Sequence, residues 1–275
     1  MCRFLPDMPK ENEGDRAFVV TFNRAIVRTP GHSMVNGITS ANLGVPDYSL
    51  ALAQHQTYVS ALQDCGLTVT VLPPDENHPD SIFVEDTALL TPKCAIIMRP
   101  GASSRRGEIE KMEAIVKEHF QTVRKIESPG TADAGDIMMV GNHYYIGLSE
   151  RTNPAGAKQI IDILKSLGMT GSTIPLKRVL HLKSGVAYLE NDNLLVAGEF
   201  KSHPELSKFN QIGIDDDEQY AANCVWINGT VLVPAGFPRT EQAVKTCGYM
   251  TIALDVSEFR KLDGGLSCLS LRFGN

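Results

Sequence analysis

The sequence predicts an α/β protein closed into a ring of five similar units, a five-bladed α/β propeller. Three observations favour this fold. A helix, a strand, a polar loop and an apolar hairpin recur in this order with a period of roughly 40–50 residues, which is typical of propellers and arrays. The hairpins are too apolar to stand alone. The last unit lacks a hairpin partner, and a strand near the N-terminus can supply it, so the two ends would meet and close the ring.

The composition fits a globular protein with a large core. The chain has 275 residues, of which 43% are hydrophobic and 21% charged, and its formal net charge is −6. No basic block is present, which argues against nucleic acid or a membrane surface as a partner. A negative net charge suits a small cationic substrate. The six cysteines form no C-x-x-C pair and no histidine cluster accompanies them, so no metal site is expected.

The N-terminal region has no apolar leader, and no stretch is long and apolar enough to span a bilayer, so we expect a cytoplasmic protein. Residues 1–20 are polar and rich in Pro and Gly, which predicts a flexible extension. Residues 21–275 are expected to form a single α/β-propeller domain.

The first two units each combine a helix, a strand and a hairpin. The first has a helix over 47–65, a strand over 67–72 that Pro73 and Pro74 stop, and apolar runs at 82–90 and 94–98. The second has a helix over 104–120, a strand over 123–126, and a hairpin of 137–140 with 144–147.

The third unit has a helix over 155–167, a strand over 172–176, and a hairpin of 186–189 with 194–197. The fourth has a short helix after Pro204, a loop at 215–217, and a hairpin of 224–227 with 231–233 around Asn228-Gly229, the strongest short hairpin signal in the chain. The fifth has a helix over 240–246, a strand over 250–254, a loop over 255–265, and a strand indicated by the alternation of Leu269, Leu271 and Phe273. Residues 24–28 are the natural partner of this last strand. An α/β sandwich with irregular sheet order is the alternative architecture.

Polar side chains fall in the same connection of successive units, between the strand and the hairpin. These are Asp80, Glu85 and Asp86 in the first unit, Asp133 and Asp136 in the second, His181 in the third and Cys268 in the fifth. Equivalent loops of a closed ring meet at its axis. A thiol, an imidazole that transfers protons near neutral pH and several carboxylates would therefore share one cavity. Paired carboxylates match the planar guanidinium group.

Each of these residues also has a structural interpretation. Cys268 alone could be a small buried hydrophobe, and His181 lies between leucines, as a core histidine would. Asp80 and Asp86 could cap turns, and Asp136, which follows a glycine, could close one. Their placement in equivalent loops is what favours a shared site.

Seven motifs along the chain, taken together, indicate a resemblance to a known family. They are P-D-S-I-F-V-E-D at 79–86, R-P-G at 99–101, S-R-R-G-E at 104–108, A-G-D-I at 134–137, G-L-S-E-R-T-N at 147–153, L-H-L-K-S-G at 180–185 and D-G-G-L-S-C at 263–268. From about Arg24 to Phe273 the sequence resembles the bacterial type of dimethylarginine dimethylaminohydrolase, within the guanidino-group-modifying superfamily.

The resemblance implies the five-bladed α/β propeller of the pentein fold and a hydrolase that needs no metal or organic cofactor. Its substrates would be Nω-methylated arginines, converted to citrulline and methylamine or dimethylamine through a covalent thiouronium intermediate. Cys268 resembles the nucleophile and His181 the general acid and base. Asp133 falls where the family has its His-orienting carboxylate, at which bacterial relatives often carry Glu.

The resemblance also implies a set of substrate contacts. Asp86 and Asp263 resemble guanidinium contacts, with Glu85 beside them, and Asp80 resembles the group that meets the substrate amino end. Arg105 and Arg151 resemble the clamp on the substrate carboxylate. Ile38 and Leu262 fall where the family lines its pocket, and a loop near Gly37 resembles its lid. A homodimer is possible.

Three other functions stay open at this point. An arginine deiminase would use the same catalytic set on unmethylated arginine and release ammonia. An amidinotransferase would pass the amidino group to an amine instead of water, although it usually has a longer chain. A non-catalytic guanidine-binding protein would need the carboxylates without the thiol.

Overall fold

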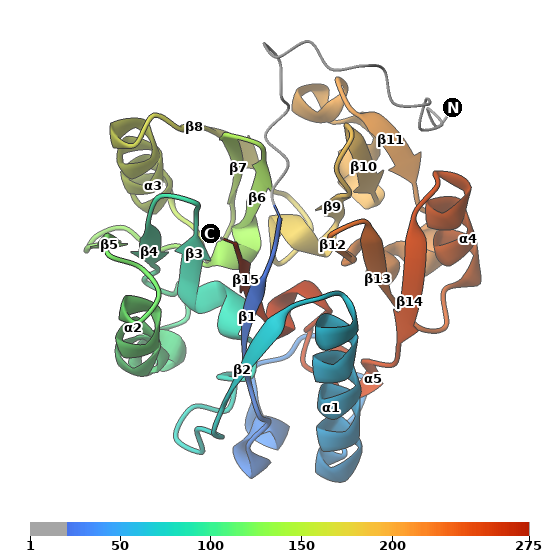
Figure 1. Cartoon of the computed structure of the whole chain (residues 1–275), viewed down its shortest axis with the longest axis horizontal. Coiled ribbons are helices and arrows are strands. Elements are labelled where there is room, and N and C mark those ends of the chain that lie inside the picture. The colour runs from blue at the N-terminus through green and yellow to red at the C-terminus, as the bar shows by residue number, and fades with distance from the viewer. Residues whose placement is uncertain (1–20, 275) are drawn as a thin grey trace.

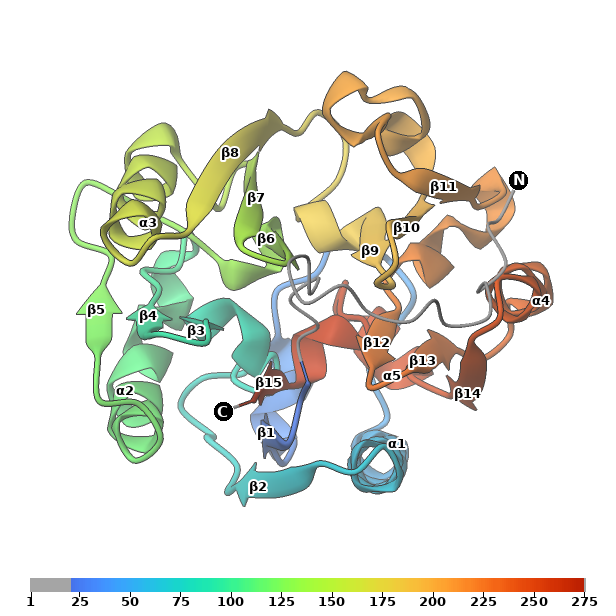
Figure 2. The ribbon, with the colours of Figure 1, turned by 45° about the horizontal axis from the view of Figure 1, so that its top comes forward.

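Five three-stranded sheets surround a common axis in the computed structural model, which describes residues 21–274 (Figures 1 and 2). The extension predicted over residues 1–20 lies outside the described residues. In every sheet the middle strand pairs antiparallel with the inner strand and parallel with the outer one. We call each sheet with its covering helix or turns a blade.

The strands of the five blades are given from the inner to the outer position. They are β15 (Leu271–Phe273), β1 (Arg24–Arg28) and β2 (Thr68–Leu72); β3 (Ala88–Leu90), β4 (Ala95–Ile97) and β5 (Val123–Lys125); β6 (Ile137–Val140), β7 (His143–Leu148) and β8 (Thr170–Pro175); β9 (Val186–Tyr188), β10 (Asn193–Val196) and β11 (Asn210–Gly213); and β12 (Val225–Ile227), β13 (Thr230–Pro234) and β14 (Met250–Leu254).

Helices on the outside of the ring connect the middle strand to the outer strand, because a parallel pair needs a crossover (Figure 2). They are α1 (Tyr48–Asp64), α2 (Ile109–Lys117), α3 (Pro154–Ser166) and α4 (Pro238–Thr246). In the remaining blade two short 3₁₀ turns, η6 (Gly198–Ser202) and η7 (Pro204–Leu206), make this connection. Side chains of Asp47 and Asn153 cap α1 and α3 by accepting hydrogen bonds from backbone N–H groups of the first turn.

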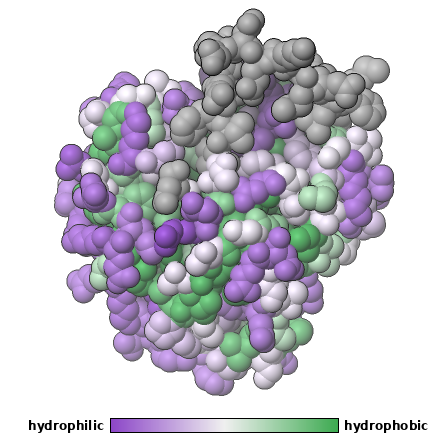
Figure 3. Space-filling view, viewed as in Figure 1, coloured by the Kyte–Doolittle hydropathy of each residue, from purple (hydrophilic) through white to green (hydrophobic). Residues whose placement is uncertain are grey.

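The hydrophobic core is divided into five clusters, each between two neighbouring blades. In β4, for example, Ile96 faces one cluster, and Ala95 and Ile97 face the next. Both faces of the inner and middle strands are therefore covered, which explains why these strands are continuously apolar. On the face shown in Figure 3, hydrophobic residues gather toward the middle and hydrophilic ones around the rim.

Pairing of the two ends of the chain closes the ring. Residues 24–28 pair with the last strand, as the sequence predicted, with Arg24 opposite Phe273 and Ile26 opposite Leu271. This closure confirms the five-bladed α/β propeller. Five 3₁₀ turns precede the five inner strands and surround the axis: η2 (Val84–Thr87), η4 (Ala134–Asp136), η5 (Leu182–Ser184), η8 (Asp216–Ala222) and η9 (Ser267–Leu269).

Several predicted elements were wrong in detail. The outer strand β11 and the short helix α5 (Ser257–Arg260) were missed, and Leu269 lies in a 3₁₀ turn and not in the last strand. The helix predicted from residue 104 begins as the 3₁₀ turn η3 (Ser103–Glu108), and the helix expected after Pro204 is also a 3₁₀ turn. A further turn, η1 (His32–Asn36), precedes α1. Among the described residues, no helix has both the length and the apolar character to cross a bilayer.

Candidate active site

The turns at the ring axis hold the residues that the sequence singled out. Asp86 lies in η2, Asp136 in η4 with Asp133 just before it, and Cys268 in η9. His181 immediately precedes η5. Because each turn leads into the inner strand of a different blade, residues far apart along the chain hydrogen-bond at this axis, such as Ser267 and Glu85, which are 182 positions apart. The fold therefore brings these side chains to one central region.

His181 and Asp133 form a buried hydrogen-bonded pair. Nε2 of His181 lies 3.1 Å from Oδ2 of Asp133, whose other oxygen accepts a hydrogen bond of 2.9 Å from the backbone N–H of Gly101. Asp133 is 1% exposed, and burial disfavours its charged form, but the hydrogen bond and charge of His181 keep its pKa below the usual range. An aspartate is thus long enough to reach the imidazole at this position.

The imidazole of His181 is held in its protonated form. Burial lowers its pKa, yet the charges of Asp86, Asp136 and Asp133 and the hydrogen bond to Asp133 raise it to about 9. With Nε2 directed at Asp133, Nδ1 is the nitrogen left to exchange a proton with a bound molecule. A group that carries a proton at neutral pH and can release it is suited to act as a general acid.

Asp86 connects the imidazole and the thiol electrostatically. Its Oδ1 accepts a hydrogen bond of 3.0 Å from the N–H of Gly135, and its Oδ2 pairs with Arg105. Its charge raises the pKa of both His181 and Cys268. A Cβ at position 135 would lie 2.7 Å from Oδ1 of Asp86 and 2.9 Å from Nδ1 of His181, so only glycine allows this approach.

Cys268 is a thiol in the resting protein. Desolvation first, and then the charges of Glu85 and Asp86, raise its pKa to about 12, although the N–H of Gly265 lies 3.5 Å from Sγ and opposes this shift. A thiol surrounded by carboxylates is a poor nucleophile until a cation arrives. The site is therefore built to react in the presence of a positively charged ligand.

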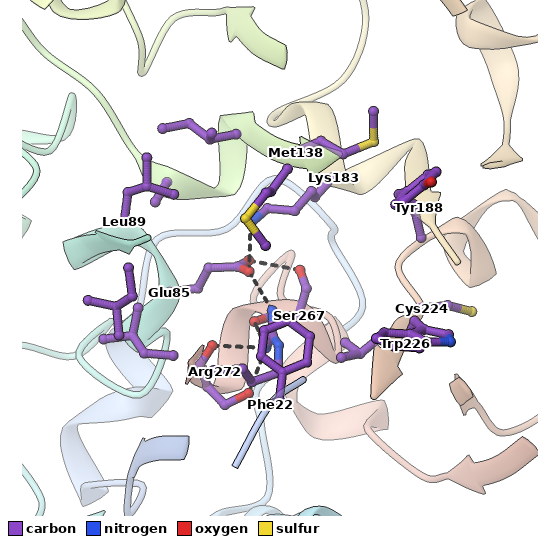
Figure 4. A pocket seen from close by; sticks show the side chains of 18 of the residues that line it. Phe22, Glu85, Leu89, Met138, Lys183, Tyr188, Cys224, Trp226, Ser267 and Arg272 are labelled. Carbon is purple, nitrogen blue, oxygen red and sulfur yellow. Dashed lines mark hydrogen bonds and ion pairs between the residues drawn. The ribbon is translucent and has the colours of Figure 1, made fainter. Parts of the chain in front are cut away.

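Glu85 lines a cavity on the ring axis and forms an ion-pair cluster there (Figure 4). Its Oε1 accepts from Lys183 at 2.7 Å and from Arg272 at 3.1 Å, and its Oε2 accepts from Ser267 at 2.8 Å. The cavity measures about 150 Å³, and the inner strands of all five blades line it through Leu89, Met138, Tyr188, Trp226 and Arg272. The sequence predicted that Glu85 lies beside the residues that contact the substrate guanidinium. In the structure Glu85 pairs with two cations of the protein, Lys183 and Arg272.

The loop of residues 37–46, between η1 and α1, is tied to two of the predicted substrate contacts. The N–H of Ile38 donates to Oδ1 of Asp80 at 2.9 Å, and the N–H and hydroxyl of Ser40 both donate to Oδ2 of Asp263. A Cβ on Gly37 would lie within 3.3 Å of both Asp80 and Leu262, so this loop packs tightly on them. Ile38, Leu262, Asp80 and Asp263 therefore meet at one edge of the site.

The two predicted clamp arginines lie in different surroundings. Arg105 is buried and donates to Glu108 through two nitrogens, to Asp86, and to the carbonyls of Asp80 and Phe83, so only one of its N–H groups remains. Arg151 is half-buried, and its charge lowers the pKa of Asp80, opposing the larger effect of burial. Arg151 thus acts on Asp80 through its charge, and it is less buried than Arg105.

The comparisons with known proteins agree with this geometry. The profile of a family described as "N,N dimethylarginine dimethylhydrolase, eukaryotic" matches residues 47–196. The N(G),N(G)-dimethylarginine dimethylaminohydrolase of Pseudomonas aeruginosa is 56% identical over 253 residues, which cover 92% of this chain and 100% of the relative. The chain belongs to the dimethylarginine dimethylaminohydrolase family.

Two solved structures of dimethylarginine dimethylaminohydrolase share this fold at a TM-score of 0.91 and 56% identity, each covering 92% of this chain and 100% of the other. One is the Pseudomonas aeruginosa protein with a cysteine replaced by serine, in complex with citrulline. The other has a histidine replaced by glycine and is an adduct with S-methyl-L-thiocitrulline.

Three side chains of this dimethylarginine dimethylaminohydrolase family member also converge as metal ligands would. Ligand atoms of Asp86, Asp133 and His181 lie within 4.8 Å of one another. However, Nε2 of His181 carries the proton shared with Asp133, and the raised pKa of the imidazole favours this protonated form. A metal ion would have to displace that proton, so the protonated imidazole does not suit the role of a metal ligand.

Sequence reasoning missed the residues that hold the axial turns together. Asn223 accepts a hydrogen bond from the N–H of Ser267 at 2.8 Å and donates to the carbonyl of Lys183 at 3.1 Å. Lys183 stood within one of the familiar motifs without an assigned role. Asn223 directly follows η8, the turn of the one blade for which the sequence indicated no site residue. The absence of a predicted residue in this fourth unit was the signal that could have pointed to Asn223.

Proposed function

We propose that this chain hydrolyses Nω-methylated arginines, such as asymmetric dimethylarginine and monomethylarginine, to citrulline and dimethylamine or methylamine. One observation carries the proposal: a protonated His181, paired with Asp133, and a thiol, Cys268, both lie in the field of the same carboxylate, Asp86. A guanidinium group bound at Asp86 would stand between an acid and a nucleophile. The family membership supports the same reaction.

The first half-reaction is activated by the substrate itself. A guanidinium beside Asp86 and Asp263 adds the positive charge that the resting thiol lacks, which lowers the pKa of Cys268, so the thiol releases its proton to solvent and becomes a thiolate. The sulfur attacks the guanidinium carbon and forms a C–S bond. Nδ1 of His181 then gives its proton to the methylated nitrogen, the C–N bond breaks, and the methylamine leaves. A covalent thiouronium remains on Cys268.

The second half-reaction consumes one water molecule. Neutral His181, still oriented by Asp133, takes a proton from water, and the oxygen adds to the thiouronium carbon. The C–S bond breaks, the proton left on the added oxygen passes to the departing sulfur, and citrulline is released while Cys268 becomes a thiol again. The carboxylate of Asp133 stabilises the imidazolium that forms in this step.

The remaining contacts would bind the amino-acid end of the substrate. Asp80 would accept the α-ammonium group and Arg151 would hold the α-carboxylate, since the two side chains interact already. Arg105 would contribute its remaining N–H while it holds Asp86 in place. Ile38 and Leu262 would cover the substrate methylenes, with the loop of residues 37–46 as the lid. Glu85 would act on the site through Lys183 and Ser267.

Citrulline formation from asymmetric dimethylarginine, monomethylarginine and arginine, measured side by side, tests this function. We expect citrulline and the matching alkylamine from the methylated substrates, and no turnover by Cys268→Ser or His181→Ala. Ammonia from arginine with no reaction of the methylated substrates would indicate an arginine deiminase. No citrulline at all, with a thiol that iodoacetamide does not label selectively, would indicate a guanidine-binding protein. A cytoplasmic location and a homodimer remain predictions from the sequence.

A further inference from the structure

Hydrogen bonds between neighbouring blades join the five axial turns into a closed ring. Five contacts make this ring: Gly135 N–H to Asp86, Leu182 N–H to Asp136, Asn223 to the carbonyl of Lys183, Ser267 N–H to Asn223, and the Ser267 hydroxyl to Glu85. Each blade thus fixes the turn of the next. Four of these contacts involve a residue of the proposed catalytic or binding set or its direct sequence neighbour.

Asp136 is the member of this ring that the proposed mechanism does not use. Its side chain is 0% exposed. Oδ1 accepts a hydrogen bond of 3.0 Å from the N–H of Leu182, the residue after His181, and Oδ2 accepts one of 2.6 Å from the hydroxyl of Ser149. A carboxylate that is fully buried and bonded to two separate turns fixes their relative position.

The contact with Ser149 extends to the substrate clamp and to Asp133. Oγ of Ser149 accepts hydrogen bonds from the N–H groups of Arg151 at 3.0 Å and Thr152 at 3.1 Å. The hydroxyl of Thr152 in turn accepts from the N–H of Asp133 at 3.2 Å. One carboxylate is therefore connected to the backbone of the general acid, of its orienting carboxylate and of the clamp.

We propose that Asp136 is a positioning residue that holds the imidazole of His181 and the guanidinium of Arg151 at the distance one substrate molecule requires. This inference rests on the proposed function, because it assigns the two groups to the guanidinium end and the carboxylate end of the same ligand. Asp136 itself touches neither end. It sets the geometry by accepting from Leu182 on one side and from Ser149 on the other.

Asp136 also contributes charge near His181. The charged groups that act on this imidazole are Asp86 from η2, Asp136 from η4 and Asp133, which precedes η4. The charge of Asp86 also acts on the thiol of Cys268. Asp86 is itself paired with Arg105. Removing the charge at position 136 therefore leaves two carboxylates to sustain the protonated imidazole, and its pKa should fall.

Two substitutions separate position from charge. Asp136→Ala removes both hydrogen bonds, and we expect kcat/KM for asymmetric dimethylarginine to fall about 100-fold, the cost of a small misplacement of reacting groups. Asp136→Asn keeps an oxygen for the N–H of Leu182, so it should recover most of that loss while the basic limb of the pH profile moves to lower pH. Glu218→Gln is the matched control, because Glu218 is a buried carboxylate that accepts from the N–H and hydroxyl of Thr240 at the start of α4.

Ser149→Ala keeps the test decisive if Asp136→Ala fails to fold. It removes the contacts to Arg151 and Thr152 and leaves the one from Leu182 to Asp136, so KM should rise several-fold, by more than kcat falls. The titration of His181 by NMR in resting Asp136→Asn gives a readout without turnover, and its pKa should lie below that of the wild type. If wild-type protein turns over no methylated arginine, the proposed function fails while this titration still tests Asp136. With an active wild type, the inference would be overturned if folded Asp136→Ala kept a kcat/KM within threefold of the wild-type value, or if Asp136→Asn lost as much activity as Asp136→Ala. An unchanged KM in Ser149→Ala would also overturn it.

Discussion

Replacing Asp133 by Asn tests how the general acid is kept charged. The imidazole of His181 has a pKa of about 9 and lies 3.1 Å from Oδ2 of Asp133. Loss of an adjacent opposite charge lowers a pKa by about 1–3 units, which would bring that of His181 to between about 6 and 8. At pH 8 the protonated fraction would then fall from about nine-tenths to between about one-half and one-hundredth.

The amide nitrogen of Asn would also oppose the N–H of the imidazole, which disturbs the ring orientation. We therefore expect kcat at pH 8 to fall at least about tenfold, a loss that can stay below the roughly 10²–10⁴-fold of general acid–base catalysis because the imidazole itself remains. The assay is citrulline formation from asymmetric dimethylarginine between pH 6 and 10.5, with Asp133→Glu as the control that restores a carboxylate. A folded Asp133→Asn variant that keeps both the kcat and the basic limb of the wild type would refute this reasoning.

Three further predictions follow from the contacts around the axis. Cys268→Ser should bind asymmetric dimethylarginine, detected by calorimetry, without forming citrulline; turnover would contradict the nucleophile assignment. Glu85→Gln leaves Lys183 and Arg272 without their anion, so the free energy of unfolding in urea should fall by about 3 kcal/mol, the lower end for broken buried ion pairs. An unchanged midpoint would be inconsistent with that role. Ser40→Ala removes one of two hydrogen bonds to Asp263, so KM should rise by no more than about fivefold, and a larger change would mean that the hydroxyl binds substrate directly.

The blade repeat could be predicted from the sequence because each hairpin carries its own local signal. Asn228 and Gly229 adopt φ values of 49° and 94°, the turn that an Asn-Gly pair favours. The strand β11 escaped prediction because Asn210–Gly213 has a single buried side chain, Ile212, at the outer edge of its sheet. Leu269 was misplaced because an alternation of three apolar residues does not distinguish a strand from a 3₁₀ turn that leads into one.

The site could be predicted as a set of residues but not as a network. Cys268, His181 and Asp133 stand in equivalent connections, and the closure of the ring explains why such residues meet. The hydrogen bonds that orient them leave no local pattern, because their partners are far away in sequence: Ser267 bonds Asn223 across 44 positions and Leu182 bonds Asp136 across 46. For the same reason the sequence did not indicate that Arg105 holds Asp86 in the resting protein.

The covalent intermediate on Cys268 is the most direct test of the account. Turnover of asymmetric dimethylarginine and of monomethylarginine is stopped by acid, and the tryptic peptide of residues 262–272, in which Cys268 is the one cysteine, is analysed by mass spectrometry. We predict the same adduct mass on Cys268 from both substrates, since each has lost its methylated nitrogen before the quench. An adduct that retains methyl groups, one on another residue, or none at all during active turnover would contradict the mechanism.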